Sequence, residues 1–152
     1  HHAVACLSYV VEWIEEGGAK APYLIGRKDR QLMWTPAFVG PNLDNKEEFG
    51  FAICTRPPNG FFSHFHDRMV GVLTSDLAKV WIHPEGHSEK ELLACVRAPD
   101  DDDELAAFKV KGDIAKRKSG DWSAIETQGR PVTSADLGKP AGGKVKQARL
   151  GE

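Results

Sequence analysis

The densest cluster of ionisable side chains in this chain is the pentapeptide His64-Phe65-His66-Asp67-Arg68. Histidine is the side chain best suited to donate and accept protons near neutral pH. Arg68 could hold a phosphate group through its forked guanidinium. A His-x-His pair also suits a metal ion, but no third histidine or cysteine stands at ligand spacing. The pattern favours proton transfer beside an anion site; an exposed polar loop, or a metal-dependent hydrolase that adds the acidic run 100–104, are the alternatives.

Glu12 is the second candidate, because it interrupts the apolar run Val10-Val11-Glu12-Trp13-Ile14. A charge in such a strand is costly unless it is paired or lies at the mouth of a pocket. Burial there would raise the pKa of the carboxyl toward values useful in acid–base catalysis. The alternative is a strand-end glutamate that points into water. We therefore take Glu12 and His66 as candidate acid–base groups.

The elements that must position these side chains are mainly β-strands. Runs rich in valine and aromatic residues, bounded by charged turns and glycines, are typical of strands. Pro36 lies inside one such run and marks it as an edge strand or a bulge. Between two others, the long segment 56–68 carries the histidines, and long loops in compact domains are usually functional. The predicted strands cover residues 3–14, 22–27, 31–39, 49–55, 69–73 and 108–114.

Two helices are predicted after these strands. Thr74-Ser75-Asp76 is a helix-start signal, and His83-Pro84 ends that helix. Ser88 and Glu91 have the spacing of a capping box for the second helix. The predicted class is α+β, a mainly antiparallel, barrel-like sheet with two following helices, with an incomplete sheet at the amino end as an option. We expect one domain over residues 1–130 and a flexible basic tail over 131–152.

Composition limits the classes of function. The chain has 152 residues, 41% hydrophobic and 28% charged, which suits one globular domain. Its net charge of −2 argues against a whole-chain polyanion binder, although the segment 109–149 carries ten basic and four acidic residues and could contact phosphates. Three cysteines without a CxxC pair favour a reducing, intracellular compartment, cytoplasmic or nuclear. No apolar run is long enough to cross a membrane.

Four stretches of the chain together resemble the SOS-response-associated peptidase (SRAP) family. VVEWIEEGGAKAPYLI is similar to the family's Glu-Trp strand, charged turn and Pro-aromatic strand. GFAICT, followed by HDRMVGVLT, resembles its threonine strand and its His-Asp-Arg-Met segment. SDLAKVWIHPEG is similar to the following helix, and VKGDIAKRKSGDWSAIE, more loosely, to the closing strand and loop. The resemblance covers residues from about 3 to about 130.

This resemblance implies a role in handling abasic sites in single-stranded DNA. In the family, an amino-terminal cysteine condenses with the ring-opened sugar aldehyde of the lesion to give a thiazolidine cross-link. By position, Glu12 corresponds to the glutamate that holds the reacting amine, and His66 to the histidine that assists opening of the sugar ring. Trp13, Thr55 and Arg68 correspond to DNA-binding residues of the site. The resemblance implies no metal, no cofactor and no membrane partner.

The sequence departs from the family pattern near its start, where it has no Met-Cys-Gly-Arg segment. Cys6 lies inside a predicted strand, so its amine is held in a peptide bond, and Val70 replaces the family's usual proline. We therefore expect the carboxy-terminal part of a SRAP protein, whose whole domain cross-links abasic DNA. The alternative is a degenerate, non-catalytic single-stranded DNA-binding or protein-interaction module. Exposed strand edges also predict a second chain or self-association over the first strand.

Overall fold

The computed structural model describes residues 1–42, 44–45, 48–97, 104–111, 114 and 127–137. Its elements, in chain order, are β1 (His2–Leu7), β2 (Val10–Glu16), β3 (Ala19–Arg27), β4 (Met33–Pro41), β5 (Phe49–Ile53), β6 (Thr55–Arg56), a 3-10 turn (Phe62–His64), β7 (Met69–Val70), α1 (Ser75–Ile82), α2 (Glu89–Arg97), β8 (Leu105–Lys109) and α3 (Ser134–Leu137).

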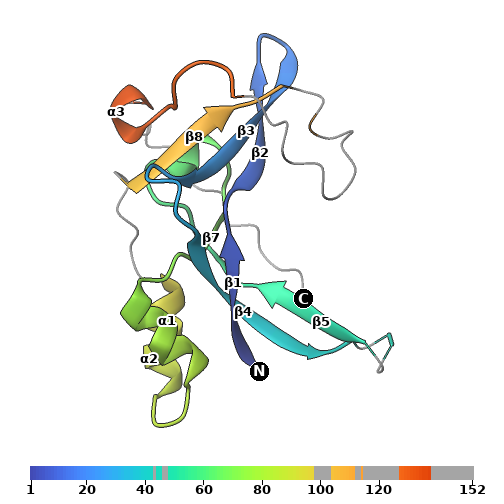
Figure 1. The fold of residues 1–152 in the computed structure, drawn as a ribbon, viewed down its shortest axis with the longest axis vertical. Helices are drawn as coiled ribbons and strands as arrows, with labels where there is room; N and C mark the ends of the chain where they lie inside the picture. Colours follow the sequence, from blue (N-terminus) through green and yellow to red (C-terminus); the bar gives the residue numbers. More distant parts are fainter. Residues whose placement is uncertain (43, 46–47, 98–103, 112–113, 115–126, 138–152) are drawn as a thin grey trace, which may run out of the picture.

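The described strands pair in antiparallel fashion and are accompanied by helices, which confirms the predicted α+β class. The strands form three sheets, with orders β1-β4-β5, β2-β3-β8 and β6-β7. Figure 1 shows the first of these sheets in the lower half of the molecule and the second in the upper half. The described strands do not close into a barrel, so that part of the expectation is corrected to separate sheets.

The single strand predicted for residues 3–14 is wrong, because the chain there forms two strands that belong to different sheets. The break falls at Ser8 and Tyr9, where the chain passes close to Gly26 of β3. A Cβ atom on Gly26 would lie 2.6 Å from the Ser8 carbonyl oxygen and 2.6 Å from a Tyr9 ring carbon. The crossing from one sheet to the next therefore requires a residue without a side chain at this position.

Pro36 lies in β4, the central strand of its sheet, so the expectation of an edge strand or bulge is also wrong. Val39 and His1 exchange both backbone hydrogen bonds, so the bonded pairs with β1 fall on alternate positions. Pro36 faces Val4 in one of the intervening, non-bonded pairs. On its other side the Pro36 carbonyl accepts from the Cys54 amide at 2.8 Å, one residue after β5 ends. Pro36 cannot donate the return bond, and the Cys54 carbonyl accepts from the Gly71 amide at 3.1 Å instead.

The largest core cluster attaches the histidine-bearing loop, residues 56–68, to the sheets. Phe61 and Phe62 from this loop are both about 2% exposed, so the loop contributes directly to the core. Burial of large aromatic side chains is the main driving force for such an attachment. The buried members of the cluster are Tyr23, Ile25, Met33, Phe61, Phe62, Met69, Leu105 and Ala107.

The two predicted helices are confirmed, including their starts. Thr74 caps α1 by accepting a hydrogen bond from the Leu77 amide at 3.3 Å. Ser88 and Glu91 form the predicted capping box, with the Glu91 carboxylate 2.7 Å from the Ser88 amide. The helix pair lies beside the β1-β4-β5 sheet (Figure 1), where the indole of Trp81 donates to the Ala3 carbonyl at 2.8 Å.

The last strand, β8, begins and ends earlier than the predicted 108–114 segment. Ala107 of β8 exchanges two backbone hydrogen bonds with Val132, of 2.9 and 2.8 Å, and α3 follows. The division into a domain over 1–130 and a tail over 131–152 stays a prediction, because residues 138–152 lie outside the described part of the chain. None of the described helices is long and apolar enough to cross a membrane.

Candidate functional site

Glu12 occupies the inward face of β2. Residues at even positions of this strand are half-buried and those at odd positions are exposed. Val10 and Ile14, the neighbours of Glu12 on its own face, pack against the largest core cluster. The carboxylate therefore emerges between two apolar side chains, and partial burial raises the pKa of Glu12 above its usual range.

The structure brings Glu12 together with His66, although the two are distant in the sequence. After burial, the next largest influence on the pKa of Glu12 is the charge of His66, which lowers it. The carboxylate of Asp67 acts in the opposite direction and raises the pKa. Such electrostatic coupling requires that residues 66 and 67 of the loop lie near the Glu12 side chain. The carboxyl group and the imidazole therefore lie within electrostatic reach of each other.

Aromatic contacts and a short turn set the course of the loop before His66. The Asn59 side-chain oxygen accepts a hydrogen bond from the Phe62 amide at 2.8 Å and starts the 3-10 turn. The Phe65 ring lies 5.2 Å from the Phe61 ring and 5.6 Å from the Tyr23 ring, measured between centroids. The chain leaves this aromatic group at His66, whose amide donates to the Phe62 carbonyl at 3.1 Å.

Arg68 is held by Thr55. The guanidinium Nε donates to the Thr55 hydroxyl oxygen at 3.0 Å, and Nη2 bonds the same oxygen. Thr55 is fixed in turn because it belongs to β6 and pairs with Val70 of β7. Within the described part of the chain, Nη1 makes no hydrogen bond, so one arm of the guanidinium fork is free. An exposed guanidinium with a free arm is well suited to bind a phosphate oxygen.

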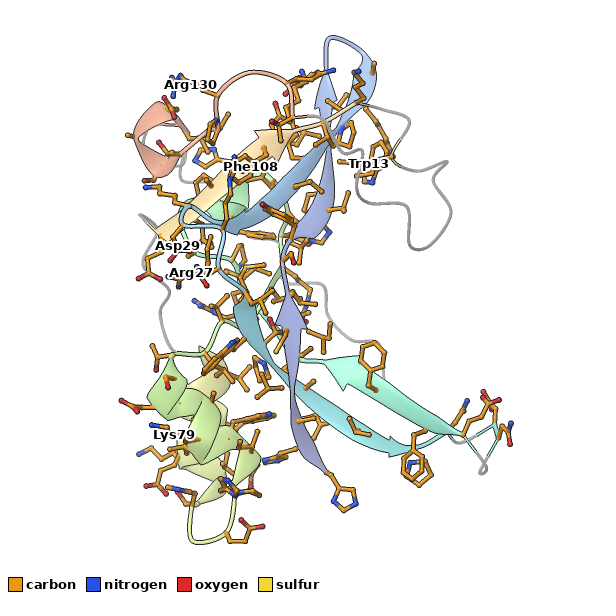
Figure 2. All side chains as sticks on the ribbon, in the orientation of Figure 1. Trp13, Arg27, Asp29, Lys79, Phe108 and Arg130 are labelled. Atoms are coloured by element: carbon orange, nitrogen blue, oxygen red, sulfur yellow. The ribbon has the colours of Figure 1, made fainter. Side chains whose placement is uncertain are left out.

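Trp13 lies apart from this group. It follows Glu12 directly in β2, so its side chain projects from the opposite face of the strand. Its indole is 38% exposed, and Figure 2 shows it beside β2. The structure thus brings together Glu12, His66 and, through one loop, Arg68 with Thr55, but not Trp13. The functional roles of all five residues stay predictions.

The sequence reasoning missed a second polar cluster on the same face of the sheet. Tyr23 donates to one carboxylate oxygen of Glu16 at 2.6 Å, and the Lys109 ammonium lies 2.5 Å from the other. Burial, together with the charge of Glu16, raises the pKa of Tyr23 to about 12. The spacing of Glu12 and Glu16 in a strand places both carboxylates on one face, and that was the available signal. Lys109, the lysine partner of Glu16, belongs to β8, and nothing near it in the sequence indicates this pairing.

The metal-dependent alternative draws on the acidic run 100–104, of which residues 100–103 lie outside the described part of the chain. Over the described ranges, no three side chains among His, Cys, Asp and Glu are arranged to hold a metal ion. His64 and His66 of the pentapeptide therefore lack a converging third ligand in that part of the molecule. Cys6 is exposed, Cys54 half-buried and Cys95 buried, and all three are free thiols.

Comparison with known proteins identifies the family. The family model for the SOS response associated peptidase (SRAP) matches residues 3–117. The chain therefore belongs to the SRAP family, which confirms the resemblance drawn from the four motif stretches.

Relatives and solved structures agree with this assignment. The abasic site processing protein YoqW of Bacillus subtilis is 29% identical over 75 residues, which cover 49% of this chain and 33% of that protein. YoaM of the same species, with the same descriptive name, is 29% identical over 76 residues, 50% of this chain and 33% of that protein. The chain thus matches about a third of the length of these curated relatives.

Two crystal structures share the fold. A protein from Bacteroides thetaiotaomicron superimposes with a TM-score of 0.67 at 24% identity, over 77% of this chain and 52% of its own. A phage-related protein from Bordetella bronchiseptica gives a TM-score of 0.57 at 24% identity, over 72% of this chain and 53% of its own. At this level of identity the likeness establishes the fold alone.

Proposed function

We propose that this domain binds single-stranded DNA at an abasic site and serves the response to DNA damage. The observation that carries the proposal is the electrostatic coupling of Glu12 with His66, on the loop from which Arg68 extends a free guanidinium arm. The names of the relatives, which process abasic sites, support the same substrate. In this proposal Arg68 binds the phosphate beside the lesion, and the acid–base pair faces the opened sugar.

The acid–base pair suits condensation of an amine with a sugar aldehyde. That reaction needs a group to take a proton from the attacking amine and a donor for the oxygen that leaves as water. A half-buried carboxyl with a raised pKa and an imidazole can fill these two roles. We propose that cross-linking belongs to the whole family domain and that this chain alone holds the lesion without a covalent bond. A degenerate module that binds DNA without any chemistry is the alternative.

The test is incubation of the chain with a single-stranded oligonucleotide that contains one abasic site. Electrophoresis under native conditions should show a complex that weakens as salt rises, because phosphate binding releases counterions. Denaturing electrophoresis should show no shifted band from this chain alone. A band that survives denaturation would overturn the non-covalent part of the proposal. Binding that ignores ionic strength would argue against phosphate contacts.

Replacement of Arg68 by alanine should weaken this binding about tenfold, because one charge-assisted phosphate contact contributes on the order of 1–3 kcal/mol. The slope of affinity against salt should also fall by about 0.7, the contribution of one phosphate in a single strand. Fluorescence anisotropy at several salt concentrations measures both quantities. Lys79→Ala is the matched control, since it removes one exposed positive charge from α1, where its partner is Asp76 (Figure 2). Equal effects of the two variants would contradict a specific role for Arg68.

Replacement of Glu12 by glutamine should stabilise the fold at neutral pH. Burial raises the pKa of Glu12 in the folded state, so the folded protein favours the protonated carboxyl. The resulting contribution to the free energy of unfolding is fully present below the pKa that Glu12 has in the unfolded chain. That contribution is lost as pH rises through the folded pKa, and glutamine removes the cost of the buried charge. Urea unfolding should therefore give a higher midpoint for Glu12→Gln than for the wild type at pH 7, and equal midpoints at about pH 3, below the ordinary glutamate pKa. Glu15→Gln, on the exposed face of β2, should change neither midpoint.

This chain also has a surface suited to bind a second chain, and we propose that the second chain is another copy of the same protein. The face of the β1-β4-β5 sheet that carries Phe49 and Phe51 is apolar, and these rings are 75% and 72% exposed. They border a groove of about 300 Å³ lined by Ala3, Val4, Ala5, Ala37, Val39, Phe49, Gly50 and Phe51. In a two-fold dimer the same apolar face is supplied twice, so apolar surface meets apolar surface.

Phe51→Ser should therefore lower self-association, with a rise of about tenfold in the dimer dissociation constant from the loss of one large buried ring. Sedimentation or small-angle scattering across a concentration series measures this constant. Ile82→Ser is the control, because Ile82 is also an exposed apolar residue but lies on α1 and does not line this groove. A wild-type chain that stays monomeric at micromolar concentration would contradict the proposal.

A further inference from the structure

We propose that Asp67 is a positioning residue that holds the His66 imidazole with a proton on Nδ1 and leaves Nε2 as the nitrogen available to the DNA. The functional half of this inference rests on the proposed function above. The structural half concerns which ring nitrogen carries the proton, and it stands on contacts within the loop.

Three polar groups surround Nδ1 of His66. The Asp67 carboxylate oxygen Oδ1 lies 3.0 Å away, and the Arg68 carbonyl oxygen lies 3.1 Å away. The Arg68 amide nitrogen is the third neighbour, at 3.0 Å. Two of these groups can only accept a hydrogen bond, and one can only donate.

The two acceptors decide the position of the proton. With a proton on Nδ1, the ring donates to the Arg68 carbonyl, and its positive N–H end lies at ion-pair distance from the Asp67 carboxylate. Without that proton, the lone pair of Nδ1 faces both oxygens and is repelled by them. The hydrogen bond from the Arg68 amide is then the one favourable contact among these three groups. The carboxylate outweighs the amide because it carries a full charge. The partner of one ring nitrogen thereby selects the tautomer of the whole ring.

The location of Asp67 ties this arrangement to the candidate site. Asp67 is close enough to Glu12 for its charge to raise the pKa of that carboxyl, as His66 lowers it. All three side chains therefore share one electrostatic environment. Within it, a neutral His66 presents the lone pair of Nε2 and can accept a proton there. The imidazolium that forms lies beside the Asp67 carboxylate, whose negative charge stabilises the new positive charge.

The tautomer can be read directly by nitrogen NMR on the free protein. In a long-range proton–nitrogen correlation spectrum at a pH where the ring is neutral, His66 should show a protonated Nδ1 and an unprotonated Nε2. Its ring signals are assigned by their absence in His66→Ala. In Asp67→Ala the signals should move toward the opposite tautomer, because the Arg68 amide is then opposed by one acceptor instead of two. Asp67→Glu should restore much of the wild-type pattern if a carboxylate is what the ring requires.

Asp76→Ala is the matched control, because Asp76 is an exposed carboxylate on α1 whose partner is Lys79. It should leave the His66 signals unchanged. The Asp67 side chain is 81% exposed, so its replacement should leave the urea midpoint within the range typical of surface substitutions. A wild-type ring with its proton on Nε2, or the same tautomer in Asp67→Ala, would overturn the inference.

This outcome is independent of the proposed function. The NMR measurement contains no DNA, so it decides the tautomer whether or not the domain binds abasic sites. Conversely, an Arg68→Ala variant with wild-type affinity for abasic DNA would overturn the proposed phosphate site and leave the tautomer untouched. If both hold, Asp67→Ala should also slow cross-linking in a whole family domain, while its affinity for the DNA phosphate stays the same.

Discussion

Phe61→Ala should lower the free energy of unfolding by about 3–5 kcal/mol, the usual cost of removing a buried phenylalanine ring. Phe61 is 2% exposed and belongs to the cluster that joins the histidine loop to the sheets. The substitution removes the contact of its ring with Phe65 and leaves a cavity beneath the loop. For a domain of this size, such a loss is a large share of the total stability.

Urea denaturation followed by tryptophan fluorescence measures this effect. Leu32→Ala is the control, because it removes apolar atoms from a side chain that is 49% exposed and lies outside the proposed dimer surface, and it should change the free energy by about 0.5 kcal/mol or less. Comparable losses in the two variants would show that the loop is not fastened through Phe61. DNA binding by Phe61→Ala should also weaken, since the loop carries His66 and Arg68.

Gly26→Ala should destabilise the fold by about 1–3 kcal/mol, or prevent folding, because the site has no room for a methyl group. The added Cβ would lie 2.6 Å from the Ser8 carbonyl oxygen, which is backbone and cannot rotate away. Relief requires a shift of the segment that joins β1 to β2. Because β2 carries Glu12, the same shift would move the carboxyl relative to His66.

Gly40→Ala is a close control for this prediction. Gly40 is also a strand glycine, in β4, and a Cβ there would meet nothing within 4 Å. Its replacement should be neutral or slightly stabilising, because alanine restricts the unfolded chain more than glycine does. Thermal unfolding of the two variants beside the wild type tests the difference. Equal melting temperatures for both would contradict the close approach at Gly26.

The two substitutions act on the same feature, which is the seating of the loop against β2. Phe61 packs the loop into the core, and Gly26 lies against Ser8 and Tyr9, where the chain passes from β1 to β2. We therefore expect both substitutions to change the separation of Glu12 and His66. The site is therefore sensitive to packing in the core as well as to its own side chains.

The amino-acid sequence by itself determined the features that depend on neighbouring residues. The cap at Thr74 and the capping box at Ser88 were predicted correctly, because both involve groups three residues apart. The α+β class and the family also followed from the sequence, since strand-forming runs and the Glu-Trp and His-Asp-Arg-Met motifs are contiguous.

Only the tertiary structure decided how distant segments meet. The division of residues 3–14 between two sheets depends on the close approach at Gly26, and the position of Pro36 in a central strand depends on the Gly71 amide, which replaces its missing donor. The coupling of Glu12 to His66, and the pairing of Glu16 with Lys109, join segments far apart in the chain. Strand register and core packing set such contacts, and neither is encoded in any short stretch of sequence.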